Sequence, residues 1–256
     1  MSSSASSSPL LPRRLARNAS AAVDEGSLVF RGGATEAALK LSVSPRARVM
    51  RLKVDPRTAE VLLTVPRRVS RRQALEWAAG HRHWIEQQLA RIEPAQGLVP
   101  GAEIRLHDVP HRIEWTGEAS RRIRVEEGRI LSGGPLETLQ PRLLRWLARH
   151  ALDTLSGETA EFARKAGVGV TRVAVGDPRS RWGSCSSSGA IRYSWRLILA
   201  PDWVRRATVA HEVAHRVHMN HGPDFHALVE ALLEADPAPA RLWLRRHGAA
   251  LHRVGA

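Results

Sequence analysis

The chain has 256 residues, of which 43% are hydrophobic and 25% charged, so it can bury the core of one large domain or of two small ones. Its single cysteine, Cys185, excludes an internal disulfide and a zinc site made of several cysteines, so any zinc would be held by histidine, aspartate or glutamate. No apolar run reaches the roughly 18 residues of a membrane-spanning helix, which excludes an integral membrane protein. Because no export signal is recognisable, we expect a cytoplasmic protein.

The charge is strongly positive. Lysine and arginine number 39 against 25 aspartate and glutamate residues, which gives a formal net charge of +14. Such a balance favours contact with a polyanion, a nucleotide or a nucleic acid, through the basic N-terminal half. Nearly all of this charge is arginine, which is also the bias of a GC-rich genome, so the charge alone does not decide whether a polyanion is bound.

The N-terminal half is predicted to be mainly β-structure. Residues 1–22 are rich in serine and arginine, lack acidic residues and show no periodic apolar face, so we expect a disordered tail. Beyond it, short runs rich in valine and leucine predict strands at 28–30, 38–44, 48–54, 60–66, 102–107, 110–115, 121–126 and 129–131. A helical periodicity over 70–92 interrupts them. Together these elements predict a β-rich N-terminal domain with one helix over residues 23–133.

A Gly-Gly-Pro sequence at 133–135 predicts the domain boundary, and the pattern changes beyond it. A stripe of leucines predicts a long helix over 137–166, which Gly157 could divide in two. The remaining elements are expected to be strands at 170–176 and 190–200, a Ser- and Gly-rich loop between them, and helices at 201–219, 223–235 and 237–248. The chain is therefore predicted to be α+β, with a mixed C-terminal domain over 134–256.

The most informative segment is His-Glu-Val-Ala-His at 211–215, inside a predicted helix. Residues four apart share one face of a helix, so His211 and His215 can direct their ring nitrogens at one metal ion. Glu212 is rotated by about 100° from His211. It therefore borders the metal without binding it, and can take a proton from metal-bound water. The small and apolar residues around these three favour a buried active-site helix.

A catalytic zinc ion needs a third protein ligand and an open position for water. His221 is favoured, because it precedes a Gly-Pro pair at which the helix must end and the chain can turn back. Glu230 or Glu234 could instead reach back from the next helix. His218 shares the helix face, but it lies about 10.5 Å from His211 along the axis, which makes convergence on one ion difficult.

These residues carry a resemblance to a known family. Segment 211–215, the Met-Asn-His-Gly sequence that follows it and Phe225 resemble the YgjP-like metallopeptidases, relatives of the SprT-like group within the zincins. The Ser-Arg-Trp-Gly-Ser-Cys-Ser sequence at 180–186 and the Trp-Arg-Leu-Ile-Leu-Ala-Pro sequence at 195–201 agree with the same family. The resemblance covers about residues 40–253, and its two core motifs together are highly specific.

The resemblance implies a zincin-like fold for residues 134–256. It implies one zinc ion held by His211, His215 and His221, with Glu212 as the general base. It also implies a hydrolase that acts on a protein or peptide.

Two positions depart from the family pattern. An aromatic residue, usually tryptophan, commonly follows the phenylalanine, and here it is His226. The residue at position 218 is often acidic in relatives, and here it is His218. Neither belongs to the implied ligand set, so these departures bear on substrate preference and not on metal binding.

Three further side chains are candidates for substrate contact: Arg181, Trp182 and Tyr193. Arg181 could bind a carboxylate or a phosphate, or stabilise an oxyanion. Tyr193, the only tyrosine, could polarise a carbonyl, and Trp182 could form a platform for substrate. Each also has a structural interpretation, since the arginine could tie its loop to the domain and both rings could belong to the core. Cys185 is interpreted as a small packed residue and not as a metal ligand.

The activity that we expect is hydrolysis by a zinc metallopeptidase. Two alternatives stay open at this point. The same metal centre could hydrolyse a phosphoanhydride such as a nucleoside triphosphate, with Arg181 and the basic N-terminal half holding the phosphates. The chain could also be a nucleic-acid-associated protease, as the SprT-like relatives suggest, although its tryptophans lie mostly within apolar patterns.

Overall fold

The computed structural model describes residues 29–32, 35–117 and 120–256, and the tail expected at 1–22 lies outside the described residues. Over the described part, the fold is mixed α+β, with three small sheets and six α-helices, which agrees with the predicted class. No helix in this part is both long enough and apolar enough to cross a membrane.

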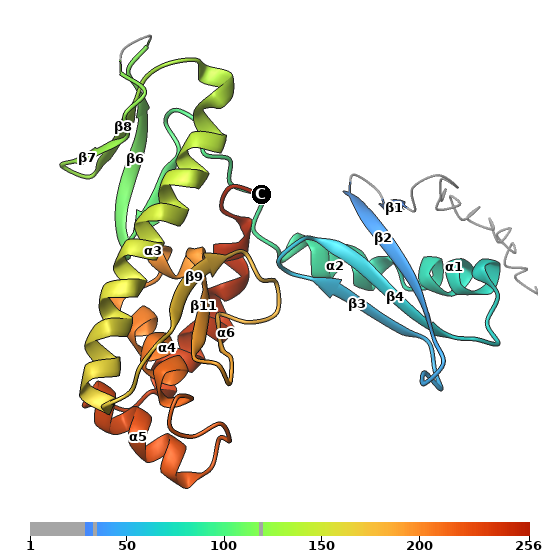
Figure 1. The fold of residues 1–256 in the computed structure, drawn as a ribbon. Helices are drawn as coiled ribbons and strands as arrows, with labels where there is room; N and C mark the ends of the chain where they lie inside the picture. The colour runs from blue at the N-terminus through green and yellow to red at the C-terminus, as the bar shows by residue number, and fades with distance from the viewer. Residues whose placement is uncertain (1–28, 33–34, 118–119) are drawn as a thin grey trace, which may run out of the picture. The chain divides into compact units, whose positions relative to one another are not determined.

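The chain divides into two compact units (Figure 1). Over the described residues, the smaller unit comprises 29–32, 35–54 and 60–89, and the larger unit comprises 55–59, 90–117 and 120–256. The predicted site residues all lie in the larger unit.

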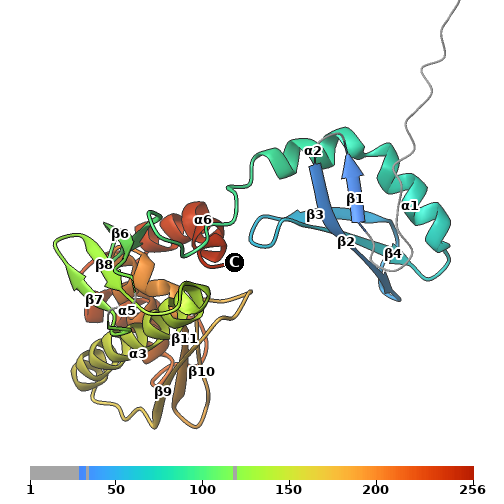
Figure 2. The ribbon, with the colours of Figure 1, turned by 90° about the horizontal axis from the view of Figure 1, so that it is seen from above.

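The smaller unit combines a four-stranded sheet with two helices (Figure 2). The strands are β1 (Val29–Gly32), β2 (Thr35–Ser44), β3 (Arg51–Asp55) and β4 (Glu60–Pro66), in the order β1-β2-β4-β3, and the helices are α1 (Arg71–Gly80) and α2 (Arg82–Ala90). Alternate residues of β4, Val61, Leu63 and Val65, are buried. This alternation follows from the two-residue period of a strand, and it gives the unit an apolar core that the helices cover.

The helical stretch predicted as one element over 70–92 forms two helices. Ser70 and Gln73 cap the start of α1 reciprocally, each side chain accepting the other residue's backbone N–H. At the other end, the N–H of His81 donates to the carbonyl of Ala78, and α2 begins one residue later. Gly80 precedes this break, and glycine is the weakest helix former after proline.

The larger unit contains the other two sheets and four helices. One sheet has the order β5-β6-β8-β7, formed by β5 (Glu103–Leu106), β6 (Val109–Trp115), β7 (Arg124–Glu126) and β8 (Arg129–Ser132). The other has the order β10-β11-β9, formed by β9 (Arg172–Gly176), β10 (Gly183–Cys185) and β11 (Ala190–Ser194). The helices are α3 (Leu139–Ala166), α4 (Asp202–Ala214), α5 (Pro223–Leu233) and α6 (Ala238–Arg253), with 3-10 turns at Leu136–Thr138 and Trp195–Leu199.

Helix α3 is central to the core of the larger unit. Leu139, Leu143, Leu147 and Leu155 recur at helical spacing and are at most 1% exposed. They belong to the same apolar cluster as residues of β11 and α4. Gly157 does not divide the helix, which continues to Ala166, because the apolar stripe and its packing outweigh the roughly 1 kcal/mol that a glycine costs inside a helix.

The division between the units differs from the boundary predicted near 133–136. The sheet formed by β5 to β8 belongs to the larger unit, because Ile104, Ile113 and Ile130 pack in the same core as α3. The N–H of His107 also donates to the carbonyl of Ile198, at 2.8 Å. Residues 90–133 read as part of a β-rich N-terminal domain only because strand patterns in the sequence do not reveal which helix covers them.

Candidate metal centre

Helix α4 positions the predicted active-site segment. Val204, Val209 and Val213 lie on its buried face and are fully buried. His211 and Glu212 belong to the last turn of the helix, and His215 caps its C-terminus. The helical pattern predicted to run on to 219 therefore ends earlier.

The chain turns directly after α4 and brings His221 back to its end. The N–H of His218 donates to the carbonyl of Ala214 at 2.9 Å, which closes the turn. Helix α5 then begins at Pro223, a residue that favours the first turn of a helix. This local geometry follows the Gly-Pro signal that favoured His221 in the sequence.

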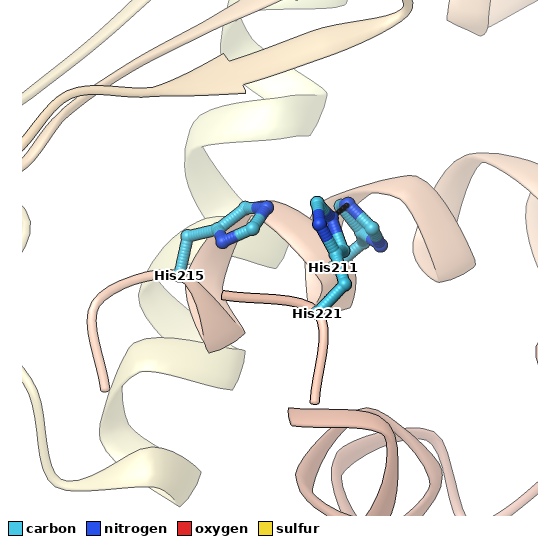
Figure 3. Close-up of side chains that lie close together, drawn as sticks. All are labelled: His211, His215 and His221. Carbon is cyan, nitrogen blue, oxygen red and sulfur yellow. Dashed lines mark hydrogen bonds between the residues drawn. The ribbon is translucent and has the colours of Figure 1, made fainter. Parts of the chain in front are cut away.

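Three imidazoles converge at this turn (Figure 3). His211, His215 and His221 each offer one ring nitrogen, and these atoms all lie within 4.8 Å of one another. The Nε2 atoms of His211 and His221 are 3.1 Å apart. Nitrogens bound to one tetrahedral zinc ion at ~2.0–2.1 Å would lie roughly 3.4 Å apart. The donor atoms and their spacing therefore fit a single divalent ion.

A buried phenylalanine supports all three rings. The ring centroid of Phe225 lies 4.9 Å from that of His211, 4.6 Å from that of His215 and 4.7 Å from that of His221. Phe225 is 1% exposed, so its position in α5 is fixed by the core. The sequence analysis used Phe225 only as part of the family resemblance. Its contact with the three histidines could not be predicted, because the side on which its ring packs depends on the turn that precedes α5.

The orientation of His215 is set by the backbone. Its Nδ1 lies 3.1 Å from the carbonyl oxygen of His218. Because a carbonyl can only accept, Nδ1 carries the proton, and the Nε2 lone pair of a neutral ring is left free. His218 thus contributes its carbonyl to the centre, and its side chain is not one of the three converging rings.

The environment favours neutral imidazoles. Burial, together with the neighbouring rings of His215 and His221, lowers the pKa of His211 to about 4. Burial also lowers the pKa of His215. Near neutral pH both rings therefore keep a lone pair for a metal ion, as ligation requires.

The other third-ligand candidates lie outside this group. Among the described residues the converging set contains neither Glu230 nor Glu234. Glu230 is exposed on α5, and Glu234 pairs with Lys165 at 3.1 Å. Cys185 is not in the set either, and burial raises the pKa of its thiol, which disfavours the thiolate that binds metals.

Glu212 lies beside the histidines in a dry environment. It is 5% exposed, and burial raises its pKa to about 7, while the charge of Arg181 acts in the opposite direction. Its carboxylate rests against Gly183 of β10, where an added Cβ would lie 2.5 Å from Oε1. The glycine of the 180–186 segment therefore leaves room for this carboxylate, whose pKa suits both accepting and returning a proton near neutral pH.

A cavity of about 260 Å³ adjoins His211 and Glu212. Its walls are largely apolar and come from α4, α5, α6 and the residues before β10; they include Trp182, Ala207, Phe225, Val229, Ala240 and Leu244. Trp182 is held in place by the ring of His252, with centroids 5.0 Å apart. The cavity has the chemistry to hold an apolar side chain next to the proposed base.

The three candidates for substrate contact lie in different environments. Trp182 lines the cavity, as a substrate-contacting residue would. Arg181 does not line it, although its charge influences Glu212. Tyr193 is fully buried, and its hydroxyl is 3.0 Å from that of Thr159 on α3, so its interpretation as a substrate contact is replaced by that of a core residue. Strand alternation alone could not show which face of β11 meets α3.

Comparison with known proteins places these residues in context. The family model described as YgjP-like, metallopeptidase domain, matches residues 48–247, which is well over half of the chain and includes every residue of the converging set. This match confirms the resemblance drawn from the two sequence motifs. No curated protein and no solved structure gave a match.

Proposed function

This chain belongs to the YgjP-like metallopeptidase family, and on that basis we propose that it is a zinc-dependent peptidase in which Glu212 is the general base. The observation that supports this most is the convergence of three imidazoles beside a buried carboxylate. Family membership supports a metal-dependent hydrolase. The identity of the ion, the peptide substrate, the zincin-like fold and the cytoplasmic location belong to the proposal.

In this proposal His211, His215 and His221 hold one zinc ion through ring nitrogens. When bound, the ion would act as a Lewis acid that acidifies a water molecule and polarises a carbonyl group. Glu212 accepts the proton of the attacking water and then delivers it to the nitrogen of the departing amine. Burial serves this role, because it keeps the carboxylate pKa close to neutral and not near 4.5.

The cavity beside Glu212 supports a peptide substrate. Its apolar wall can take an aliphatic or aromatic side chain next to the scissile bond. A nucleoside triphosphate would instead require cationic groups at this position, and the lining contains one arginine, Arg241. The family match is to a metallopeptidase domain, so the phosphoanhydride alternative is not favoured.

The test compares matched glutamine variants of the full-length protein. Glu212→Gln removes the proton acceptor and keeps the shape of the side chain, so we expect zinc content to be unchanged and peptide turnover to fall by roughly a thousandfold or more. Glu230→Gln makes the same change at an exposed position of α5 and should keep both properties. Zinc is measured by elemental analysis, and turnover with unfolded casein and short fluorogenic peptides.

Two outcomes would overturn the proposal. Full turnover by Glu212→Gln would remove the base assignment. The wild-type protein could also release phosphate from nucleoside triphosphates in a reaction that depends on Glu212, and cleave no peptide. That result would assign phosphoanhydride hydrolysis to the centre.

A further inference from the structure

The smaller unit has an excess of positive charge, and this excess is not spread evenly. Each acidic residue that the structure describes in this unit has a cationic partner. The pairs are Glu36 with Arg31, Glu60 with Lys40, Glu76 with Arg72 and Glu86 with Arg82. The other lysine and arginine residues described in the unit are exposed, and no ion pair joins them to a described residue: Arg46, Arg48, Arg51, Lys53, Arg67, Arg68 and Arg71. Over the described residues, the unpaired charge of this unit is therefore confined to segments 46–53 and 67–71.

The strand register brings these two segments together. Strands β2 and β4 run in parallel, with Ser44 opposite Pro66, so both strands end at the same edge of the sheet (Figure 1). The segments that follow them are linked by a hydrogen bond of 3.2 Å, which Nη2 of Arg68 donates to the carbonyl of Arg48. We call residues 46–53 and 67–71 the basic edge.

The basic edge contains a hollow of about 370 Å³. Apart from Arg48 and Arg68, the residues that line it are apolar or aromatic: Val49, Met50, Pro66, Val69 and Trp77. The ring of Trp77 is only partly buried, and the ring of His81 packs beside it with the centroids 4.1 Å apart. The hollow therefore offers an aromatic surface next to two guanidinium groups.

This combination selects the chemistry of a ligand. A single phosphate or carboxylate pairs with one or two guanidinium groups, whereas the basic edge offers cations along two segments, which suits a polyanion. An aromatic ring in a hollow suits a flat base, and base–aromatic stacking tolerates every base. The bases of a duplex are paired and stacked inside the helix, so a single strand is the form that can place a base in the hollow.

We propose that the basic edge binds single-stranded nucleic acid, with its cations on the phosphates and one base in the hollow against Trp77. This function goes beyond the proposed peptidase activity and does not rest on it, because the converging histidines and Glu212 belong to the larger unit. RNA and DNA share the phosphates and bases that the basic edge would contact, so the test uses an oligomer of each.

The first experiment measures binding and its dependence on salt. Full-length protein is titrated into labelled oligouridine and oligothymidine of about 12 nucleotides, and fluorescence anisotropy is recorded. Contacts to about four phosphates would give a slope of log affinity against log salt near −3, which is a loss of roughly fiftyfold between about 50 and about 200 mM salt. A slope near zero would exclude phosphate contacts by the basic edge.

Matched double variants test the cations. Arg46→Gln with Arg48→Gln should lower the affinity for both oligomers about tenfold at about 50 mM salt, and should make the slope shallower by about 1. Arg145→Gln with Arg149→Gln removes the same charge from exposed positions of α3, and should keep the affinity and the slope, which controls for net charge. Unchanged urea unfolding curves show that the variants are folded.

A matched pair of tryptophan variants tests the hollow. Trp77→Leu keeps an apolar side chain but removes the stacking surface, so affinity for the single strands should fall about tenfold at every salt concentration. Binding to a duplex of the same length should not change. Trp84→Leu makes the same substitution on α2 at a residue that is 39% exposed and does not line the hollow, and it should keep the single-strand affinity.

Three results would overturn this proposal: no binding to either oligomer, equal losses in the double variant of the basic edge and in its α3 control, or an unchanged single-strand affinity in Trp77→Leu. Binding to phosphatidylserine vesicles that requires Arg46 and Arg48, without binding to either oligomer, would assign the basic edge to a membrane surface instead. The peptidase function is judged separately, because Glu212→Gln should bind both oligomers as the wild-type protein does.

Discussion

The first and last turns of α4 each contribute to a cluster that contains histidines, and the surroundings of the two clusters differ. Near the start of the helix, the Nε2 atoms of His107 and His150 are 3.0 Å apart. Near its end, those of His211 and His221 are 3.1 Å apart. A short distance between ring nitrogens therefore does not by itself indicate a metal site.

The two histidine clusters differ in the hydrogen bonds that their Nδ1 atoms make. At the start of α4, Nη1 of Arg205 lies 2.7 Å from Nδ1 of His107. Oδ1 of Asp202 lies 3.2 Å from the same nitrogen. A guanidinium can only donate and a carboxylate can only accept, so one of the two engages Nδ1 in either tautomer. The adjacent guanidinium charge disfavours a bound cation. At the end of α4, His215 donates from Nδ1 to a carbonyl and keeps its Nε2 lone pair available.

The largest effect that we predict is a difference in metal binding between the two histidine clusters. His221→Ala removes one of three ligands, so zinc should be lost on dialysis against a weak chelator. His150→Ala also removes one of two close imidazoles, and it should keep the zinc of the wild-type protein. Elemental analysis after dialysis gives the ratio of zinc to protein. Zinc loss in His150→Ala, or zinc retention in His221→Ala, would contradict the assignment of the metal site to the end of α4.

The next effect concerns stability. Arg205 is 3% exposed and donates to Glu158 through Nε and Nη2 at 2.8–3.1 Å. Arg205→Leu leaves the buried carboxylate of Glu158 with only Nη1 of Arg206, at 4.0 Å, as a cationic neighbour, which should lower the free energy of unfolding by about 3–5 kcal/mol. Arg206→Leu breaks the more exposed pair with Glu161 and should cost about 1 kcal/mol or less.

Urea unfolding of the metal-free proteins measures both changes. Equal losses in the two variants would contradict the distinction between a buried and an exposed pair. Zinc binding by folded Arg205→Leu should be unchanged, because this arginine acts on the packing of α4 and not on the ligands.

The smallest effect is a pH dependence. Burial lowers the pKa of His150, and the neighbouring His107 lowers it further. The unfolded chain binds this proton below about pH 6.5 and the folded chain does not, so the stabilisation is complete above that pH and is lost as the pH falls. His150→Phe keeps the stacking on Trp146 and removes the titration.

As the pH falls from about 7.5 to about 5.5, the wild-type protein should therefore lose this stabilisation and His150→Phe should not. The free energy of unfolding of the variant, minus that of the wild-type protein, should rise over this range. Urea unfolding of both metal-free proteins at these two pH values gives the difference. A difference that is independent of pH would exclude His150 as a source of the pH dependence.

Local signals in the sequence were sufficient for the centre of the site. The spacing of His211 and His215 follows from the helical period, and the Gly-Pro pair after His221 predicts the turn that brings it back. Both features act within a dozen residues, so their geometry depends little on the rest of the fold. The placement of Glu212 beside this pair follows from the same helix.

Other features depend on contacts that sequence spacing does not contain. The pairing of Arg192 with Ala174 and with Ser184 requires the register of three strands, of which β9 and β11 pair in parallel. The burial of Tyr193 requires α3 to cover one face of β11. The compact units differ from the predicted domains for the same reason, since Ile113 and Ile130 pack against a helix that follows them in the chain.

The contact between Gly183 and Glu212 has a consequence for the order in which the centre matures. The carboxylate is seated by the backbone of a separate strand, whereas the histidine pair needs only the end of α4 and the turn that follows it. In a chain whose helix has formed but whose β10-β11-β9 sheet has not docked, the histidine pair would be in place, whereas the carboxylate of Glu212 would be unseated and in water. Under the proposed function, hydrolysis therefore requires the helix and the sheet to be assembled, so a newly made chain is not exposed to its own active site before it has folded.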